Sequence, residues 1–500
     1  HELAKLYAYC NSVMEPWDGP AAIAAYADNW VIAGMDRNGL RPMRYVVTND
    51  GLVIAGSETG MVVVPEDRIV ERGRIGPGQM MGIDLARGRM FLDAALTSEL
   101  AGKQDWGKWV GRAQQMEALL ANHGSRGTAR LDPLEARRRQ MMAGWTMEDL
   151  ELILQPMAEG GKEAVGSMGD DTPLAVLSNR YRGLHHFFRQ NFSQVTNPPI
   201  DSLRERHVMT LRTRLGNLGN ILDEAPEQCD HLVLNSPVLT VPEWDALVAY
   251  LGDRAAVIDC TFAVDGEDDF TAALDRIAAE AEEAVRSGCE HVMLSDRAVD
   301  ETRAPLPMIL ATGAVHSHLV RQQLRTFASV NVATGECLDV HHFAVLIGVG
   351  ATTINAYVAE EAIAERHDRG LMPGLTLPEA GANYRKAVED GLLKIMSKMG
   401  ISVIASYRGG YNFEALGLSR ALVAKFFPPM SSRISGLGLT GIASRVTEMH
   451  RKAHEMADVF LPVGGFFRYR RSGERHAFDG QLIHAMQHAC DTGSYESWKK

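Results

Sequence analysis

Hydrophobic and polar positions change their rhythm along the chain, and these changes divide it into regions with different expected structure. Over residues 1 to about 95, short apolar runs such as WVIAG and YVVTNDGLVIAG alternate with Asn-Gly, Asp-Gly and Pro-Gly turn signals. This alternation predicts a β-rich, antiparallel part. Between about 96 and 165, charged segments that contain Met and Leu, such as PLEARRRQMM, predict mainly helices.

From about 230 to 410, apolar runs alternate with helical stretches. The clearest helix spans 268–288, and its apolar residues recur on one face: Phe270, Leu274, Ile277, Ala281 and Val285. Buried strands are expected in HLVLNSPVL, AAVIDCTF, HVMLSD, ASVNVAT, FAVLIGVGA and ISVIASY. Strands that alternate with helices predict an α/β domain with a parallel sheet covered on both sides. Its functional edge should lie at the carboxyl ends of the strands.

Composition limits the classes of partner. A chain of 500 residues with 46% hydrophobic residues suggests two to four domains with a large core. The formal charge of -12 and the pI near 5.8 leave no basic footprint for phosphates, so nucleic acid and anionic membrane surfaces are disfavoured partners. The most apolar run, residues 343–358, contains Thr352, Thr353 and Asn355 and falls short of the roughly 20 residues of a membrane span. A buried strand followed by a helix explains it better.

Cysteine and histidine spacing predicts no metal site. The six cysteines stand singly, without a CxxC pair, which is typical of reduced cytosolic thiols in or near the core. The histidine pairs are His185-His186, His316-x-His318 and His341-His342. Neighbours at i+1 or i+2 do not share a helix face, so they are interpreted as structural residues.

A glycine-containing turn, Gly348 to Thr353, is predicted to follow a strand and to precede a helix, where a phosphate could meet backbone N–H groups. It lacks the third glycine of a dinucleotide fingerprint and the lysine of a P-loop, so close strand-to-helix packing is favoured. An unrelated nucleotide-binding α/β protein built around this turn is the alternative.

The passage 183–205, GLHHFFRQNFSQVTNPPIDSLRE, combines three phenylalanines with many amide and hydroxyl side chains. A buried amide without a partner costs about 1 to 3 kcal/mol, so these groups need a bound polar ligand or a domain interface. Just upstream, Asp170 and Asp171 are predicted to cap a following helix. A capped loop packed against its neighbours is the simpler interpretation.

Several segments resemble known families. NSVMEPWDGPAAI, GMDRNGLRPMRY, SETGM and GRIGPGQM resemble the closing strands of class II glutamine amidotransferase domains. Later segments resemble, in order, the central region of the large subunit of glutamate synthases: SMGDDTPLAVLS, HHFFRQNFSQVTNPPIDSLRE, RLGNLGNIL, LATGAVHSHL, FAVLIGVGATTINAYVAEEAI, GLLKIMSKMGISVIASYRGG and SRISGLGL. The resemblance covers essentially the whole chain.

The resemblance implies a multi-domain α/β fold. Residues 1–112 would be the C-terminal part of an αββα N-terminal-nucleophile amidotransferase domain. Residues 113–465 would form the central domain with a mainly parallel sheet, and residues 466–500 would begin a flavin-binding (β/α)8 barrel. Both ends of the sequence look cut, and the chain is expected to be a fragment.

In this family, glutamine is hydrolysed in the first domain, ammonia travels inside the protein, and reduced FMN in the barrel converts 2-iminoglutarate, formed from 2-oxoglutarate, into glutamate. NADPH would supply the electrons through a small subunit, so FAD and a [4Fe-4S] centre are expected on that partner and FMN and [3Fe-4S] on the full-length large subunit. The resemblance further implies a hetero-oligomer in the cytoplasm.

Catalytic chemistry does not carry over to residues of this chain. Residue 1 is His1 where the family has a nucleophilic cysteine, and Cys10 is internal. The three clustered cysteines of a [3Fe-4S] site are absent as well. We therefore expect no catalytic residue and no metal ligand here, and an isolated fragment without activity.

By resemblance, the SMGDD loop and the RQNFSQVTNPP segment line the site of FMN and 2-oxoglutarate. Met168 is expected to pack at the flavin and substrate, and Gln190, Gln194 and Asn197 to line the cavity. The aromatic, amide-rich segment would exclude water from a reactive imine. Two alternatives are kept: a ferredoxin-dependent glutamate synthase, and a non-catalytic scaffold that docks two catalytic domains.

Overall fold

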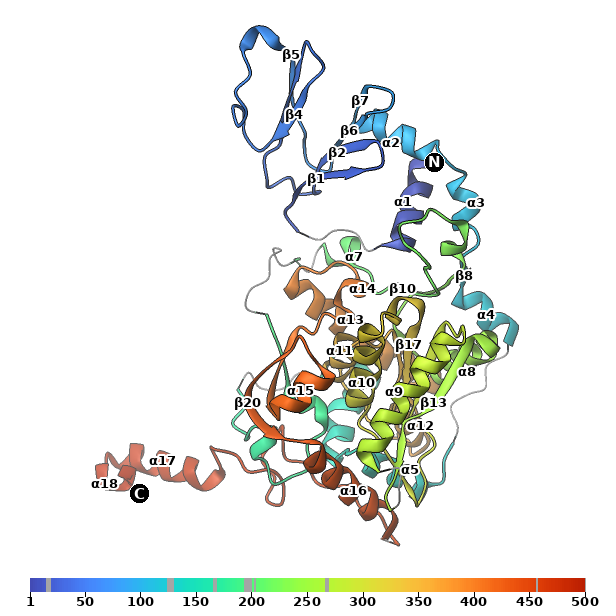
Figure 1. Ribbon diagram of the computed structural model, residues 1–500. Helices are drawn as coiled ribbons and strands as arrows, with labels where there is room; N and C mark the ends of the chain where they lie inside the picture. The colour runs from blue at the N-terminus through green and yellow to red at the C-terminus, as the bar shows by residue number, and fades with distance from the viewer. Residues whose placement is uncertain are drawn as a thin grey trace.

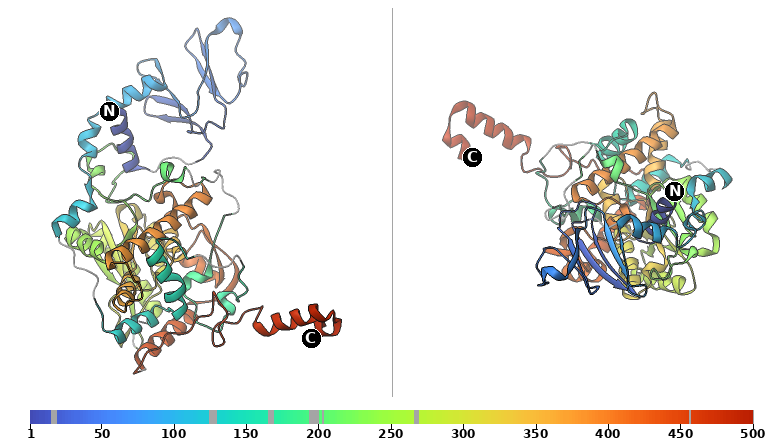
Figure 2. Two further views of the ribbon diagram at one scale, coloured as in Figure 1. Left: turned by 180° about the vertical axis from the view of Figure 1, so that it is seen from behind. Right: turned by 90° about the horizontal axis from the view of Figure 1, so that it is seen from above.

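The structure is a computed structural model of the chain. It describes residues 1–14, 19–123, 130–164, 169–192, 200–201, 204–265, 269–455 and 457–499. An N-terminal β-rich module stands on top of a larger α/β module (Figure 1). Two helices near the C-terminus, α17 (Gly480–Thr492) and α18 (Tyr495–Lys499), extend away from the α/β module, which is also clear from behind and from above (Figure 2).

The N-terminal module confirms the predicted antiparallel, β-rich part. One sheet has the strand order β1-β2-β6-β7 and the other β4-β3-β5, and every pairing in both is antiparallel. The strands are β1 (Ala22–Ala27), β2 (Trp30–Met35), β3 (Arg44–Thr48), β4 (Val53–Gly56), β5 (Ile69–Arg74), β6 (Met80–Asp84) and β7 (Arg89–Leu92). Helix α1 (Glu2–Val13) precedes them.

Helices dominate the next region, as the sequence predicts. They are α2 (Asp93–Ala101), α3 (Trp106–Val110), α4 (Met116–His123), α5 (Pro133–Met142), the π-helix η2 (Asp149–Leu154) and α6 (Gln155–Gly160). Asp132 caps α5 by accepting a hydrogen bond from the Leu134 N–H at 2.9 Å, and Pro133 occupies the first helical turn, where its missing N–H costs nothing.

A five-stranded parallel sheet organises the large module, which confirms the predicted α/β class. Its strand order is β12-β18-β17-β15-β13, and all four pairings are parallel. The strands are β12 (Val238–Leu239), β13 (Ala255–Asp259), β15 (His291–Ser295), β17 (Ser329–Ala333) and β18 (Thr353–Asn355). All residues of β17 and β18 are buried, so both faces of the sheet are covered.

The chain crosses from β12 at one edge to β13 at the other and then returns strand by strand. Three connecting helices form a layer in front of the sheet in Figure 1: α9 (Phe270–Arg286), α10 (Met308–Arg321) and α11 (Val340–Gly348). Each of these helices connects one strand to the next in the same direction across the sheet. Because such crossovers are right-handed, the three helices lie on the same face of the sheet. The apolar face predicted for α9 is buried as expected.

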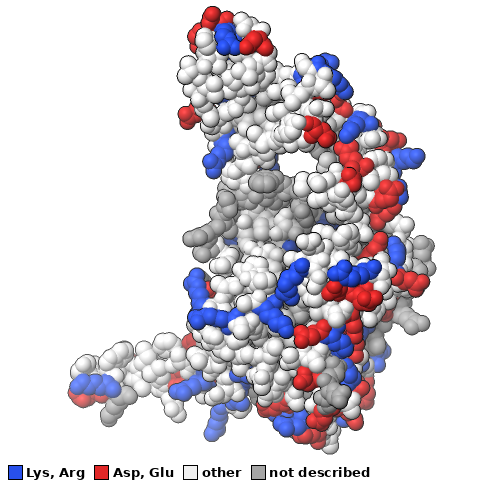
Figure 3. All heavy atoms as spheres, viewed as in Figure 1, with Lys and Arg blue, Asp and Glu red and all other residues white. Residues whose placement is uncertain are grey.

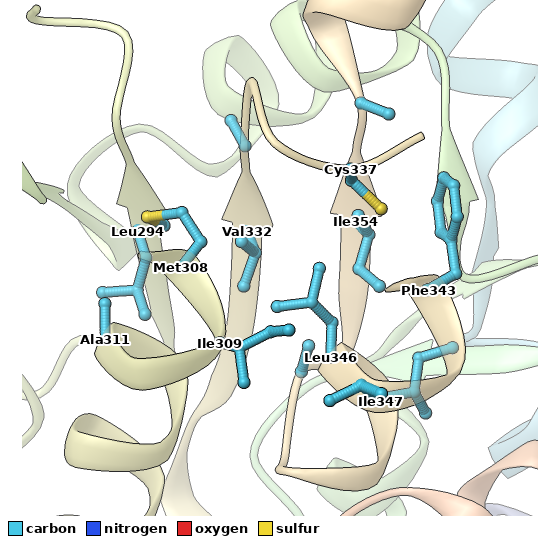
Figure 4. Close-up of a cluster of buried hydrophobic side chains, with 14 of the residues drawn as sticks. Leu294, Met308, Ile309, Ala311, Val332, Cys337, Phe343, Leu346, Ile347 and Ile354 are labelled. Carbon is cyan, nitrogen blue, oxygen red and sulfur yellow. The ribbon is translucent and has the colours of Figure 1, made fainter. Parts of the chain in front are cut away.

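The core lies between this helical layer and the sheet (Figure 4). Leu294, Val332 and Ile354 from three adjacent strands face Ile309 of α10 and Leu346 of α11, and all five side chains are fully buried. Close packing of this kind makes the layer rigid, so it can hold neighbouring segments in fixed positions.

Four strand predictions need correction. FAVLIGVGA is helix α11 followed by a loop, and the strand comes only afterwards at β18. ISVIASY is mainly the short helix α14 (Ile404–Tyr407). HLVLNSPVL splits into β11 (Leu232–Leu234) and β12, which belong to different sheets. AAVIDCTF likewise splits into β13 and the start of β14 (Thr261–Ala263), which pairs in a separate sheet. An apolar run without periodicity is compatible with a buried helix as well as a buried strand, and burial of α11 on all sides decided the outcome here.

Small sheets and helices complete the module. The remaining strands are β8 (Gln114–Gln115), β9 (Phe188–Gln190), β10 (Thr213–Leu215), β14 (Thr261–Ala263), β16 (Arg303–Pro305), β19 (Phe413–Leu418) and β20 (Ser431–Leu437). The remaining α-helices are α7 (Glu205–Val208), α8 (Val241–Leu251), α12 (Tyr357–Asp368), α13 (Leu377–Met399), α15 (Arg420–Phe426) and α16 (Leu439–Glu455). Within the described ranges, no helix combines the length and apolarity needed to cross a membrane.

Surface charge is mixed. In Figure 3, both signs alternate on the flank near α8 and α9, and a band of Lys and Arg crosses near β20 and α15. Two cations of these elements have acidic partners: Lys425 lies 3.1 Å from Asp275, and Arg433 lies 2.9 Å from Glu414. This basic band is therefore partly neutralised by the protein itself.

Candidate functional site

Buried polar residues gather at the carboxyl edge of the parallel sheet, the edge at which the sequence places function. Asp296 follows β15 and accepts a 2.9 Å hydrogen bond from the Gly335 N–H beyond β17. Glu336 accepts a 2.8 Å bond from the Met308 N–H at the start of α10. Burial raises the pKa of Asp296 to about 6 and that of Glu336 to about 8. These carboxyls hold the loops of the edge together.

The turn 144–149 covers this edge. The indole N–H of Trp145 donates to the Glu336 carbonyl oxygen at 3.3 Å, and Asp149 accepts from the Thr146 N–H and hydroxyl, both at 2.8 Å. Burial raises the pKa of Asp149 to about 6. The turn therefore provides a fixed platform between the sheet and the segments outside it.

Glu148, on this turn, binds a distant part of the chain. Its carboxylate accepts three consecutive backbone N–H groups, from Phe466 at 2.5 Å, Phe467 at 3.2 Å and Arg468 at 2.9 Å. Glu148 is 3% exposed, so these bonds form out of water, where charge-assisted hydrogen bonds are strong. Glu148 thus fixes the 462–478 segment on the platform.

The two aspartates of the predicted cap have another role. Asp170 accepts from the Thr172 N–H at 3.0 Å and forms only a local turn. Asp171 accepts from His476 Nδ1 at 2.8 Å and from the Phe478 N–H at 3.0 Å. The nearby 3-10 helix η3 (Ala175–Leu177) has no side-chain cap, so the capping prediction is wrong: the tertiary partner displaces the local one.

His476 strengthens this attachment. Its Nδ1 lies 2.8 Å from Asp171 Oδ1 and its Nε2 lies 2.7 Å from the Gly465 carbonyl oxygen. Both partners are acceptors, so the ring donates from both nitrogens only when it is protonated. Burial lowers the pKa of His476, but the bonds to Gly465 and Asp171 outweigh it, and the net shift is upward.

The middle of the predicted site segment packs in the interior. The 3-10 helix η4 (Leu184–Phe187) contacts α10 and α11, and His185 stacks on His342 with ring centroids 4.1 Å apart. Burial lowers the pKa of His185, His186 and His342 well below the usual value, so these rings are neutral. The sequence spacing indicates that these histidines have a structural role. It does not indicate that the fold brings the pairs His185-His186 and His341-His342 together. Among the described residues, no group of His, Cys, Asp or Glu is arranged to hold a metal ion.

Gln190 ends strand β9, which pairs antiparallel with β19. Its Oε1 accepts from the Tyr407 hydroxyl at 2.8 Å, and its Nε2 donates to the Asn412 carbonyl oxygen at 2.9 Å. The protein itself therefore supplies partners for this amide, as a domain interior can. The described residues leave one lone pair of Oε1 for a further hydrogen bond.

The other three predicted site residues, Met168, Gln194 and Asn197, lie outside the described residues. In the described part of the aromatic, amide-rich strip (residues 183–205), Phe187 and Phe188 are buried, and Gln190 is partly buried. Phe192 is 45% exposed. The strip thus runs from the interior to the surface.

The Gly348 to Thr353 turn has a structural role. It follows helix α11 and precedes strand β18, the reverse of the prediction. A Cβ on Gly350, whose φ is +122°, would lie 2.3 Å from His316 Nδ1, and Arg325 donates to the Gly350 carbonyl oxygen at 3.0 Å. Close packing, which the sequence favours over phosphate binding, explains this glycine.

Sequence reasoning did not find Glu148, Glu474 and His476. The polar, glycine-rich passage after about 460 signals a connection between domains, but its partners lie roughly 300 residues earlier along the chain. The Ser178 hydroxyl also donates a hydrogen bond to the Glu474 carboxylate, across a similar distance in the sequence. No local pattern predicts such pairs.

An antiparallel module, a parallel-sheet module and a buried polar junction define this chain as a multi-domain α/β protein. Residues 138–419 match the family model of the glutamate synthase central domain, and residues 1–109 match that of class-II glutamine amidotransferases. The chain belongs to the glutamate synthase family.

Curated relatives extend the match over nearly the whole chain. It is 61% identical over 99% of its length to the large chain of the NADPH glutamate synthase of Azospirillum brasilense, and covers 33% of that protein. The corresponding chain of Bacillus subtilis is 37% identical over 100% of this chain, with 32% of its own length covered. Ferredoxin-dependent glutamate synthase 2 of Synechocystis is 39% identical over 98%, with 32% covered. The chain spans about a third of the length of these relatives.

Proposed function

We propose that this chain is part of the large chain of an NADPH-dependent glutamate synthase, which makes L-glutamate from L-glutamine and 2-oxoglutarate. The observation that supports this most is the 61% identity to an NADPH glutamate synthase over 99% of the chain, against 39% to a ferredoxin-dependent relative. The domain limits expected from the sequence, 1–112, 113–465 and 466–500, are part of the proposal. So is the start of a (β/α)8 barrel after residue 465.

The central module holds a neighbour at each end. On the amidotransferase side, the Tyr9 hydroxyl donates to Gln228 Oε1 at 2.6 Å, and Arg112 donates to Asp230 at 2.6 Å. On the other side, Glu148 and Asp171 hold the 462–478 segment. In the proposed enzyme these contacts fix the distance over which ammonia passes from glutamine hydrolysis to the reductive step.

FMN would supply the hydride chemistry when bound, and the full-length chain would also carry [3Fe-4S]. Of the four residues proposed to line the flavin and 2-oxoglutarate site, Gln190 alone is described, and the remaining lone pair of its Oε1 fits a single donor from a ligand or a water. Tyr407 and Asn412 fix the orientation of this amide. Phe187 and Phe188, which are buried in the core shortly before Gln190, would exclude water from that side of the amide.

The small subunit, with FAD and [4Fe-4S], and a cytoplasmic hetero-oligomer also belong to the proposal. To test it, the gene that contains this segment is expressed at full length with a small-subunit partner, and NADPH oxidation is followed with both substrates and with each omitted. Oxidation that requires glutamine and 2-oxoglutarate together supports the proposal. Turnover with reduced ferredoxin but not NADPH would support the ferredoxin-dependent alternative.

The scaffold alternative is tested on the 500-residue chain alone. We expect no glutaminase turnover and little FMN retention, because no nucleophile for glutamine hydrolysis is assigned to these residues and they would supply only one side of the flavin site. Substitution of Met168 and Gln190 in the full-length enzyme should raise the KM for 2-oxoglutarate or lower kcat. Unchanged values of both would remove these residues from the proposed site.

A further inference from the structure

A cleft of about 380 Å³ lies between helix α16 and the 462–478 segment. Gln190, the one predicted flavin-lining residue that the structure describes, does not line it. The residues that do so come from four parts of the chain: the 144–146 turn, residues 178–181, α16 and residues 462–472. Its volume lies within the range of sites for small molecules, roughly 300 to 1,000 Å³.

The charge inside the cleft is positive although the chain carries -12. Among the described residues, three cations line it, Arg180, Arg445 and Lys452, together with one carboxylate, that of Glu448. Lys452 and Glu448 form a 2.6 Å ion pair and largely cancel. Arg180 and Arg445 therefore leave an excess of positive charge.

Arg445 is the group best placed to bind a ligand. It makes no hydrogen bond or ion pair with the residues that the structure describes, although it lines the cleft. Its Nη1 is buried without an acceptor, so a ligand in the cleft would be bound by the other N–H groups of the guanidinium. Arg180, by contrast, donates to the carbonyl oxygens of Ser472 at 2.9 Å and Gly473 at 3.1 Å. It builds the wall of the cleft.

The rest of the lining is half apolar and half neutral polar. Met449, Val463 and Phe466 provide an apolar surface, and the hydroxyls of Thr146 and Ser178 lie on the side of the platform. A ligand with a charged head and a short apolar body matches this division. The consecutive backbone N–H groups of residues 466–468, a kind of group that typically binds phosphate, are already occupied by Glu148 and do not serve a ligand in the cleft.

We propose that this cleft binds a small organic carboxylate, held at its head by Arg445 and along its body by Met449 and Phe466. Because one wall is α16 and the other is the 462–478 segment, the bound carboxylate stabilises the attachment of that segment to the platform. The proposal concerns binding and holds independently of the function proposed above.

The probe is butyrate, titrated into the 500-residue chain by calorimetry at low ionic strength. For so few atoms we expect a Kd on the order of 1 mM. The Arg445→Met variant should bind at least about 10-fold more weakly, since a charge-assisted pair is lost. Arg445→Lys, which keeps the charge but not the planar fork, should fall between the two. Arg451→Met is the matched control, because Arg451 lies on the same helix but outside the cleft. This variant should bind butyrate like the wild type.

Two further ligands separate the alternatives. n-Butylamine has the same apolar body with a cationic head and should not bind. Inorganic phosphate should bind more weakly than butyrate, and tighter binding of phosphate through Arg445 would overturn the assignment to carboxylates. Circular dichroism melts check that each variant folds. If Arg445→Met does not fold, the affinity of Arg445→Lys for butyrate decides whether Arg445 binds the carboxylate.

The effect on the segment is measured by hydrogen exchange of the Glu474 amide, which donates to the Gly464 carbonyl oxygen at 2.9 Å. At ten times its Kd, butyrate should slow this exchange about 10-fold. Absence of butyrate binding up to 50 times the expected Kd, or equal binding by the Arg445→Met variant, would refute the site.

Discussion

The three hydrogen bonds that Glu148 accepts make its replacement by glutamine the most informative perturbation of the fold. The change keeps size and shape but removes the charge and turns one acceptor oxygen into an NH2 donor. The amide oxygen can still serve Phe466 and Phe467, whereas the Arg468 N–H then faces a donor. The attachment of the 462–478 segment should therefore weaken without global unfolding.

The magnitude follows from these contacts. Two charge-assisted bonds become neutral, which costs about 1 kcal/mol each, and one buried N–H loses its acceptor, which costs about 1 to 3 kcal/mol. Because the altered geometry relaxes in part, we expect a loss of about 2 to 4 kcal/mol in the local free energy of opening. This corresponds to a roughly 30- to 900-fold faster opening-limited hydrogen exchange.

Hydrogen exchange with mass spectrometry measures this at amides that do not touch Glu148. The Glu474 amide donates to the Gly464 carbonyl oxygen and the Ala477 amide to the Asp171 carbonyl oxygen. Both should exchange faster in Glu148→Gln, while amides of the parallel sheet keep their protection. Glu151→Gln, an exposed position in the adjacent π-helix, is the control. If the two reporter amides change by less than about 3-fold, Glu148 does not hold the segment and the reasoning is refuted.

Three further predictions concern other contacts. Because the pKa of His476 is raised in the folded state, its contribution to stability is complete below the unfolded pKa near 6.5 and is lost as the pH rises through the folded pKa. Hydrogen exchange around residue 476, corrected for intrinsic rates, should therefore accelerate at alkaline pH. A His476→Gln variant should lack this pH dependence. Phe188→Ala should lower the free energy of unfolding in denaturant by about 3 to 5 kcal/mol, because the Phe188 ring is fully buried. The Phe192 side chain is 45% exposed, so Phe192→Ala should cost less than about 1 kcal/mol. Similar losses in the two variants would contradict the packing. Gly350→Ala should lower the free energy of unfolding by more than about 3 kcal/mol, because the added Cβ would lie 2.3 Å from His316. Gly370 also has a positive φ but no atom within 4 Å of an added Cβ, so Gly370→Ala should cost only about 1 kcal/mol. Thermal melts compare the two variants, and equal Tm values would be inconsistent with crowding at Gly350.

Local patterns predict much of the architecture. The face of α9 is readable because Phe270, Leu274 and Ile277 recur at helical spacing, and Asp269 caps the helix by accepting from the Thr271 and Ala272 N–H groups at 2.9 Å. The antiparallel strands of the N-terminal module follow from their turn residues. Both signals are carried by neighbours in sequence, so they survive without knowledge of the fold.

The α11 region shows where this reasoning ends. FAVLIGVG is apolar at every position, so its period carries no information, and length alone does not separate helix from strand. The helix forms because Asp339 caps it through the His342 N–H at 2.8 Å and because the sheet, α10 and α13 bury it from all sides. Propensity alone does not predict that outcome.

The candidate site divides in the same way. The sequence by itself determined the aromatic, amide-rich composition of the passage 183–205, the structural role of its histidines and the likeness to glutamate synthases, because these depend on which residues stand next to one another. Only the tertiary structure decided that Gln190 is held by Tyr407 and Asn412, and that Glu148 and Asp171 bind a segment some 300 residues away. Hydrogen bonds and buried charges select partners by distance in space, and distance in space is a property of the folded chain.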